Sequence, residues 1–546
     1  MNTKSILKPS SWFCKSWLAG SLIFGAFFCT RAWADSLETA VPKIRSVVIE
    51  RQDIFPAEEE SLWLFRLANR FHLRTKEPVV RRELLLKAGE NYDSVLAEES
   101  ERNLRALGIF GSVLVTPHII SDSLVDLLVE TSDQWTTSGN FAFGGGGGAY
   151  EFSLGFEEEN LLGWGQRFEL LYEESDLRVG RCVSFYDRKL LSRPVSLYWI
   201  AESRSDGDYY LIEAARPLYS SRDKWGARLQ GLTYTDRLRF FDHGEERFYF
   251  QQKVREASFS VLRSWGREFK TNASLGYTIT QNRFSGPFYF FSADTVHTPG
   301  RYGFVPPEER VHAFTAALNW YVNRFSEERY LDNFGVVEDV RNGESVSFEY
   351  VFGAKFLGSS LSRHELAFST GTTRKAGRHL FQVVAGNRTS FLSQNWEGSF
   401  WQGNLRYYWR WTERQTTAFR FDLSTINGLS RYGQFLLGGE KGLRGYEART
   451  LAGSRMVLGT AEHRFFGPNL FSLFGLGGVV FVDFGEAWKA DERFQSNELK
   501  GNWGAGLRLG LLRSSQFRVL RFDWARPFGS GGWIFTFGTG MSFELE

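Results

Sequence analysis

The sequence has little cysteine or proline and almost no net charge. Three Cys and 13 Pro in 546 residues exclude a disulfide-stabilised scaffold, a collagen-like chain and a Pro-rich disordered protein. The 65 Lys and Arg are balanced by 63 Asp and Glu, so the chain lacks the basic field that would attract nucleic acid, and no nucleic-acid partner is expected. After Asp35 no run of 18 apolar residues occurs, which excludes a membrane-spanning helix there.

Aromatic residues and glycine are abundant instead. Phe, Trp and Tyr make up 16% of the chain, and 55 residues are Gly, yet the mean hydropathy is only −0.29. A chain this aromatic and this polar has to spread its apolar side chains thinly. Strands with one apolar and one polar face do so, because their side chains alternate.

Residues 1–34 have the features of a secretory signal peptide. Lysines precede an apolar stretch at 17–29, and Ala32-Trp33-Ala34 is a small-x-small cleavage site. The alternative is an uncleaved membrane anchor, but about 13 apolar residues are too few to span a bilayer comfortably. We therefore expect export, with cleavage after Ala34. The exported protein is then either soluble or a membrane β-barrel.

Residues 35–135 mix helical and strand patterns. The expected elements are a strand at 44–50, helices at 62–71 and from the N-cap Asp93 to Gly108, and a hairpin of 112–116 with 124–130. This order, β-α-α-β-β, predicts one small α+β module. It is too small for a helix-rich enzyme domain.

From residue 136 to 546 a period of two replaces the helical period. Phe419, Phe421 and Leu423, for example, alternate with polar neighbours. Segments of about ten such residues are typical of a transmembrane antiparallel β-barrel, because lipid tolerates no unpaired backbone edge. Alternating runs number about twenty, fifteen before Gly438 and five after it, and the last is expected to place Phe535, Phe537, Met541 and Phe543 on one face.

A large soluble sandwich or propeller would also alternate. Its core would have to bury the Arg, Glu and Asp of the inner-facing positions, at several kcal/mol for each unpaired charge. The hydrated lumen of a barrel accepts these charges. The charge pattern therefore favours the barrel.

Motifs for enzyme chemistry are missing. His364-Glu365 lacks the second His of the helical zinc motif, and there is neither a phosphate-binding loop with Lys nor a nucleophile elbow. We predict no catalytic residue, no metal ligand and no cofactor. A five-glycine run lies in a strand context without a following helix, so a pliable first barrel strand is expected rather than a ligand loop. The run comprises Gly144, Gly145, Gly146, Gly147 and Gly148.

The segment 437–446 differs from an ordinary surface loop. Its glycines allow tight turns and close backbone approach, and they present Arg444 at a defined point. If the loop folds into the lumen, this guanidinium needs carboxylate partners, and Glu462 and Asp483 on later strands offer them. The alternative is a glycine-rich surface turn with a solvated Arg.

The motif Leu443, Arg444, Gly445, Tyr446 resembles the (V/I/L)-R-G-(F/Y) signature of the lumen-inserted sixth extracellular loop in the BamA/TamA family of outer-membrane proteins. Residues 481–485 and 521–528 resemble that family's acidic and penultimate strands, and 89–93 and 103–110 resemble its POTRA modules. The resemblance implies that Arg444 pairs with Glu462 and Asp483 on the inner wall. It also implies a barrel of sixteen strands, fewer than the alternating runs indicate.

For function, the resemblance implies a protein of the Gram-negative outer membrane, with its POTRA module in the periplasm and the lipid bilayer around its barrel. It would insert or translocate unfolded or exported polypeptides without nucleotides, with periplasmic chaperones or accessory proteins as further partners. The glycine run would weaken a lateral seam between the first and last strands. The alternative is a passive porin or surface receptor on the same barrel, with loops such as 284–310 for ligand contact.

Overall fold

The fold was analysed in a computed structural model of the chain. The structure describes residues 41–55, 66, 69–70, 72–146, 149–291, 294–296, 308–393, 395–428, 433–439, 441–471, 473–512 and 519–543. The expected signal peptide, most of the expected helix at 62–71, Gly147, Gly148 and most of the segment 292–307 lie outside these residues. No helix in the described part of the chain is long and apolar enough to cross a membrane.

The N-terminal part is a small α+β module. Its described elements are β1 (Lys43–Gln52), α2 (Glu77–Glu83), α3 (Ser94–Arg105), β2 (Phe110–Ser121) and β3 (Leu124–Asp133). The sheet has the order β1-β3-β2, with β1 parallel to β3. The carboxylate of Asp93 accepts hydrogen bonds from Val95 N and Leu96 N at 3.0 and 3.3 Å, which confirms the predicted N-cap. Helix α2 was not among the elements expected from the sequence.

The helices cover one face of this sheet and close its core. Leu96 and Leu104 of α3 and Val79 of α2 are at most 3% exposed, and they pack against Leu127 and Val129 of β3. Leucine at positions 96 and 104 recurs on one side of the helix, which is the spacing that a buried helical stripe requires. The module therefore has a hydrophobic core of its own.

The rest of the chain is a closed antiparallel barrel. Its first strands are β4 (Thr137–Gly146), β5 (Ala149–Glu158), β6 (Gln166–Ser175), β7 (Val179–Asp187), β8 (Ser196–Arg204), β9 (Gly207–Arg216), β10 (Trp225–Asp242), β11 (Glu245–Trp265), β12 (Phe269–Phe291) and β13 (Asp294–Val296). They are followed by β14 (Glu309–Val322), β15 (Arg324–Glu328), β16 (Glu338–Gly353), β17 (Arg363–Ala376), β18 (His379–Leu392), β19 (Asn395–Thr412) and β20 (Gln415–Asn427). The last are β23 (Arg455–Leu470), β24 (Phe474–Trp488), β25 (Lys500–Leu511), β26 (Val519–Pro527) and β27 (Ile534–Thr539).

Among the described residues, twenty strands follow one another around this wall. β13 and β15 are short additions beside β12 and β16, β12 pairs directly with β14 and β14 with β16, and β27 closes the barrel against β4. The count of about twenty from alternating runs is confirmed. The sixteen strands implied by the resemblance are wrong for this chain, because a family's usual strand number does not fix how many alternating segments a given member contains.

The two faces of the wall have opposite character. Exposed apolar side chains point outward, and they include Leu170, Ile212, Leu229, Phe259, Leu275, Phe314, Phe348, Leu423, Val480, Leu507 and Trp524. Buried charged residues line the inside, among them Arg406, Asp422, Glu462, Arg464, Asp483, Arg508 and Asp523. An apolar belt around a polar lumen is the pattern of a lipid-embedded barrel.

The last strand is shorter than the alternation predicted. β27 ends at Thr539, and Met541 and Phe543, both 6% exposed, are buried in clusters with residues of the inner wall. The expectation that they share one face of the last strand with Trp533, Phe535 and Phe537 is wrong. Gly540, with φ +72°, turns the chain after the strand, and the alternation cannot show such a turn.

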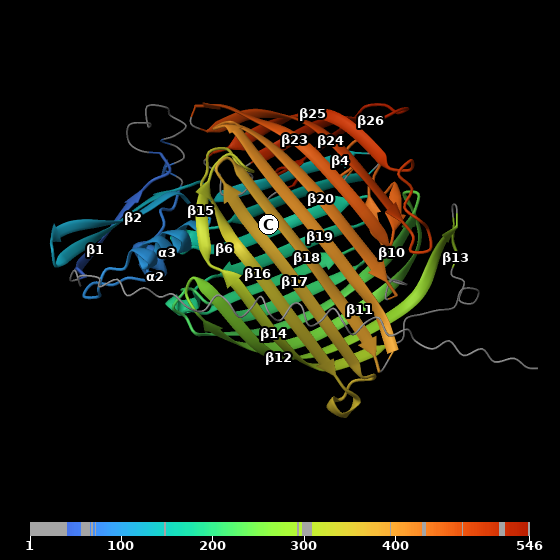
Figure 1. Cartoon of the computed structure of the whole chain (residues 1–546), viewed down its shortest axis with the longest axis horizontal. Coiled ribbons are helices and arrows are strands. Elements are labelled where there is room, and N and C mark those ends of the chain that lie inside the picture. Colours follow the sequence, from blue (N-terminus) through green and yellow to red (C-terminus); the bar gives the residue numbers. More distant parts are fainter. Residues whose placement is uncertain are drawn as a thin grey trace, which may run out of the picture.

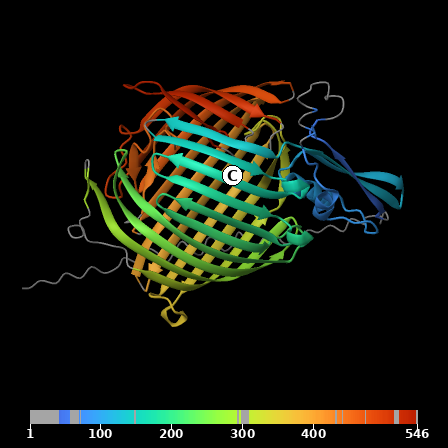
Figure 2. The same ribbon diagram turned by 180° about the vertical axis from the view of Figure 1, so that it is seen from behind.

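The small module lies against one end of the barrel, called the module end below (Figure 1), and the view from behind shows the same placement (Figure 2). Polar contacts join the two parts. Asn160 of the β5–β6 turn donates to Thr75, Ser221 of the β9–β10 turn donates to Glu99 at 2.6 Å, and Lys189 of the β7–β8 turn lies 3.1 Å from the buried Glu83. The β20–β23 loop, of which residues 428, 433–439 and 441–454 are described, lies at the opposite end.

Candidate functional site

The β20–β23 loop folds back into the lumen. It contains the short pair β21 (Phe435–Leu437) and β22 (Leu451–Gly453) and a tight turn in which Leu443 N donates to Gly438 O at 3.0 Å. A Cβ on Gly442 would lie 2.5 Å from Leu458, and one on Gly445 would lie 2.6 Å from Asn502. Glycine is therefore needed where this turn approaches the wall.

Arg444 lies at the centre of the site and is 3% exposed. Its Nε and Nη2 donate to the two carboxylate oxygens of Asp483 on β24, at 2.9 and 2.8 Å. Its Nη1 donates to Glu462 Oε1 on β23 at 2.8 Å, and the guanidinium carbon lies 3.4 Å above the Phe481 ring. The structure thus brings together the three residues that the sequence analysis singled out.

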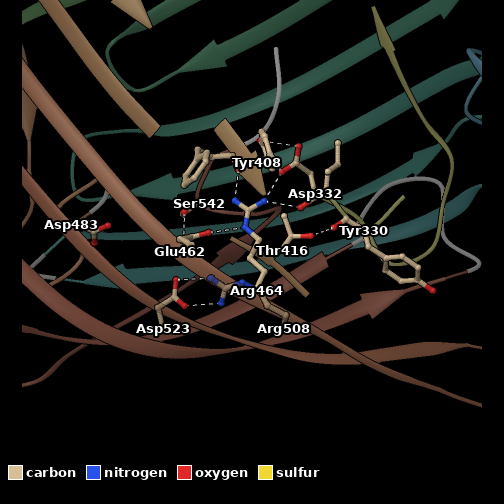
Figure 3. Close-up of polar contacts among 12 residues, drawn as sticks. Tyr330, Asp332, Tyr408, Thr416, Glu462, Arg464, Asp483, Arg508, Asp523 and Ser542 are labelled. Carbon is tan, nitrogen blue, oxygen red and sulfur yellow. Dashed lines mark hydrogen bonds and ion pairs between the residues drawn. The ribbon is translucent and has the colours of Figure 1, made fainter. Parts of the chain in front are cut away.

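A third carboxylate completes this coordination. Asp523 of β26 lies 3.4 Å from Arg444 Nη1 and accepts from Arg508 Nη1 of β25 at 2.6 Å, as Figure 3 shows for the Arg508 pair. Arg464 of β23 donates to Glu462 Oε2 at 2.9 Å. Three guanidinium groups therefore face three carboxylates. A balanced, hydrogen-bonded set of this kind is the condition under which charges can be buried.

Sequence reasoning missed Asp523, Arg464 and Arg508. The alternation contains a signal for them, because each lies an even number of residues from a lumen-facing position on its own strand. Arg464 is two residues from Glu462, and Arg508 is six from Asn502. Which inner residues meet across strands depends on register, and the alternation within one strand does not show the register with its neighbours.

The flanking residues of the motif fix the turn. Leu443 is fully buried with Leu437, Leu458 and Ala487. Tyr446 Oη donates to Gly501 O at 2.9 Å and accepts from Gly501 N at 3.2 Å. The motif therefore contributes an apolar anchor, a charge and a hydroxyl, all directed at the wall formed by β23 to β25.

A second anchor attaches the loop to the opposite side of the seam. Arg449 donates from Nη1 and Nη2 to both oxygens of Asp176, in the β6–β7 turn, at 2.7 and 2.9 Å. Gln434 also bonds the backbone of Phe241 at the end of β10. The loop thus crosses from the last strands to the first and connects both sides of the β27–β4 pair.

The predicted seam residues lie in β4 and just beyond it. Gly144, Gly145 and Gly146 pair with Glu151, Tyr150 and Ala149 of β5. Gly147 and Gly148 lie outside the described residues. β27, the partner of β4 on the other side, has six residues, against 15 in β24. Few backbone hydrogen bonds are available between β27 and β4, because the number of such bonds follows the length of the shorter strand.

A cavity of about 390 Å³ lies beside Arg444, between the loop and the wall. Arg420, Lys441 and Arg521 line it together with Asp483. In the described ranges no group of three or more His, Cys, Asp or Glu is placed to hold a metal ion. This arrangement holds the β20–β23 loop inside the barrel through ion pairs between Arg444 and carboxylates of the wall.

Comparisons with known proteins match mainly the C-terminal part of the chain. Residues 381–543 match the model of the Omp85 superfamily domain. This range includes Arg444 and its three carboxylate partners Glu462, Asp483 and Asp523, a set called the lock on Arg444 below. A Treponema pallidum (strain Nichols) protein, provisionally named an outer membrane protein assembly factor, is 30% identical over 185 residues, which are 30% of this chain and 21% of that protein. The outer membrane protein assembly factor BamA of Neorickettsia risticii (strain Illinois) is 28% identical over 118 residues, 21% of this chain and 16% of that protein.

Solved structures of low sequence identity were also found. BamA from Haemophilus ducreyi lacking POTRA domains 1–3 has a TM-score of 0.41 and 14% identity, and covers 92% of this chain and 85% of its own. CdiB from Acinetobacter baumannii has a TM-score of 0.44 and 12% identity, with coverages of 92% and 74%. The sequence matches confirm the resemblance to BamA/TamA-like proteins, and in the C-terminal part of the chain this resemblance extends to the Omp85 superfamily domain. The matched stretches span about a fifth or less of the two curated relatives.

Proposed function

We propose that this protein inserts polypeptides into the outer membrane, or translocates them across it, with no enzyme chemistry of its own. In this proposal residues 35–135 form a periplasmic POTRA module, and residues 136–546 form the membrane barrel. The module end then faces the periplasm, and the β20–β23 loop enters the lumen from outside. The relatives named as assembly factors for outer membrane proteins support this assignment.

The observation that carries the proposal is the burial of Arg444 among carboxylates on three strands. Each of Glu462, Asp483 and Asp523 is at most 1% exposed and lies within 3.4 Å of that guanidinium. Taking a charge out of water costs several kcal/mol, and removing one partner of a buried ion pair typically costs about 3–5 kcal/mol, so a loop that merely lies on the surface would not need such a set. The arrangement is understandable if the loop keeps the lumen closed at rest.

Client entry would take place at the β27–β4 seam. β27 is the shortest of the twenty wall strands, and the far end of β4 consists of glycine, which lacks side chains to pack and costs roughly 0.5–1 kcal/mol per residue relative to Ala. Opening the seam exposes strand edges that can pair with an extended client. The free energy for insertion then comes from folding of the client, because no nucleotide-binding motif is found in the sequence.

A passive porin is the second candidate. Its lumen would have to be open, whereas the loop anchored at both Arg444 and Arg449 crosses this one. No feature of the described lumen favours a porin over the assembly role.

The direct experiment follows the folding of a client. An eight-stranded outer-membrane barrel protein, kept unfolded in urea, is added to vesicles that contain the refolded protein, and its heat-modifiable folded form is measured over time. We expect faster client folding than in empty vesicles and a loss of this acceleration with Arg444→Ala. Equal rates in protein-containing and empty vesicles would contradict the proposal.

A further inference from the structure

A short loop at the module end enters the lumen from the side opposite to Arg444. This inner loop, residues 329–337, connects β15 to β16. Leu331 and Phe334 in it are 3% and 2% exposed, although loops at a barrel rim normally lie on the surface. Phe334 packs on Phe466 of β23, with ring centroids 5.0 Å apart. The inner loop is therefore part of the packed interior of the barrel.

The wall is shaped to accept Phe334. A Cβ on Gly477 of β24 would lie 2.7 Å from the Phe334 ring, and one on Gly510 of β25 would lie 2.5 Å from it. Glycine within a strand weakens that strand, and it is used where another group approaches closely. Two glycines beneath one aromatic ring indicate that the wall forms a specific binding site for Phe334.

Polar contacts fix the backbone of the inner loop. The carboxylate of Glu338 accepts from Leu331 N at 3.1 Å and from Asp332 N at 3.2 Å. Thr416 of β20 donates its hydroxyl to Tyr330 O at 2.9 Å (Figure 3). The conformation of the loop is thus set both from within and by the barrel wall.

Arg464 joins the inner loop to the lock on Arg444. Its Nη1 donates to Asp332 Oδ1 at 2.6 Å and to Leu331 O at 2.8 Å, and its Nε donates to Glu462 Oε2 at 2.9 Å (Figure 3). The other oxygen of Glu462 accepts from Arg444 at 2.8 Å. One carboxylate therefore serves both arginines, and the position of Arg464 determines how Glu462 is presented to Arg444.

The two strands that flank the inner loop are attached to the N-terminal module. Arg105 of α3 donates to both oxygens of Asp339 on β16, at 3.1 and 3.0 Å, and to Glu327 on β15 at 3.1 Å. The guanidinium of Arg102 lies 5.0 Å from the centre of the Phe325 ring. Helix α3 is thus in contact with both sides of the base of the inner loop.

We propose that Arg464 is a positioning residue that holds Glu462 for Arg444, and that the inner loop makes this lock depend on docking of the N-terminal module. This inference deepens the proposed function and rests on it. When a client draws α3 away from Glu327 and Asp339, the inner loop loses its support at the base. Asp332 then releases Arg464, Glu462 loses its orientation, and the loop that carries Arg444 is freed.

The test measures release of that loop without any client. Ala448, 8% exposed in the β20–β23 loop, is replaced by Cys in a protein whose other cysteines are serine, and the rate of labelling by a soluble maleimide is followed. Asp332→Asn should raise this rate on the order of tenfold, because it removes the charge that faces a buried guanidinium. Arg105→Ala should raise it about threefold, as expected for a partly exposed ion pair.

The double variant tests the coupling. Asp332→Asn with Arg105→Ala should label no faster than Asp332→Asn alone, because both act on one connection. Exchange of charges in Arg105→Asp with Asp339→Arg should restore slow labelling. Arg222→Ala is the matched control, since Arg222 pairs with Asp93 of the module but does not touch the inner loop, and it should leave the rate unchanged.

Three results would overturn the inference. No response to Asp332→Asn removes the positioning role of Arg464, and a response to Asp332→Asn with none to Arg105→Ala removes the link to the module. Additive rates in the double variant would show two independent effects. Every variant is first shown to retain the heat-modifiable folded form. Failure of the proposed function would appear separately, as absent client folding with normal labelling responses.

Discussion

Glu462 and Arg464 lie two positions apart on β23, so both side chains face the lumen, and Arg464 Nε donates to Glu462 Oε2 at 2.9 Å. The other oxygen of Glu462 accepts from Arg444 at 2.8 Å. A single carboxylate on the wall thus carries one arginine of its own strand and one from the loop. The local alternation of the strand is what makes this sharing possible.

Asp523→Asn should loosen the loop as well as the barrel. Asp523 is fully buried between Arg444 and Arg508, and loss of its charge removes the ion-pair partner of Arg508 and one of the three carboxylates around Arg444. We expect a loss of about 3 kcal/mol in stability. The unfolding temperature, measured from heat-modifiability, should fall, and the protease sensitivity of the β20–β23 loop should rise.

A buried ion pair outside the lock provides the control for this variant. Arg406 and Asp422 lie 2.6 Å apart on β19 and β20, and neither contacts Arg444. Asp422→Asn should lower the unfolding temperature while the loop stays protected. Equal protease sensitivity in the two variants would mean that Asp523 has no special relation to the loop.

Gly510→Ala should displace the inner loop. Its new Cβ would lie 2.5 Å from the Phe334 ring, closer than packed carbon atoms can approach. We expect about 1–3 kcal/mol of destabilisation, as for overpacking of a core. Combining it with Phe334→Ala should recover part of this loss because the ring is gone.

Gly403→Ala on β19 is the control for Gly510→Ala, since nothing lies within 4 Å of its Cβ position. It should be neutral in the same melting measurement. A neutral Gly510→Ala would show that the wall does not seat Phe334 as tightly as the structure indicates.

Asp176→Asn should weaken the second anchor of the loop. Arg449 holds both oxygens of Asp176, but the Asp176 side chain is 25% exposed, and partly solvated pairs contribute less than buried ones. We expect more frequent current fluctuations in planar bilayers, but a smaller effect than that of Arg444→Ala. Asp208→Asn, near the start of β9 at the same end of the barrel, serves as the control. Indistinguishable traces for Asp176→Asn and wild type would remove the second anchor from the account.

The sequence predicts the barrel well because a period of two is local. Phe421 and Leu423 point outward and Asp422 points inward, as the alternation requires, and the count of about twenty strands followed from the same signal. The cap at Asp93 was predictable for the same reason, since it depends on residues within one turn of α3.

The parts that escaped prediction depend on register and on long-range contacts. Arg444 with Glu462 and Asp483 was found through a motif, whereas Asp523 is 79 residues from Arg444 and meets it only after the four strands β23 to β26 have paired. The inner loop carries no motif at all. In the sequence, Phe334 cannot be told from an ordinary turn residue, because its contacts with Gly477 and Gly510 form only in the folded barrel. Phe543 is buried inside the barrel, although the alternation of the preceding strand predicts otherwise.

The most direct test of the central claim is the single-channel conductance of the refolded protein in planar bilayers, with wild type beside Arg444→Ala. The account predicts small, fluctuating currents in the wild type, because the anchored loop occludes the lumen. Loss of Arg444 removes the ion-pair partner of the buried Asp483, so the loop is released and the variant should show larger and longer openings. A large, steady wild-type conductance that is indifferent to Arg444→Ala would contradict the account and favour a passive porin.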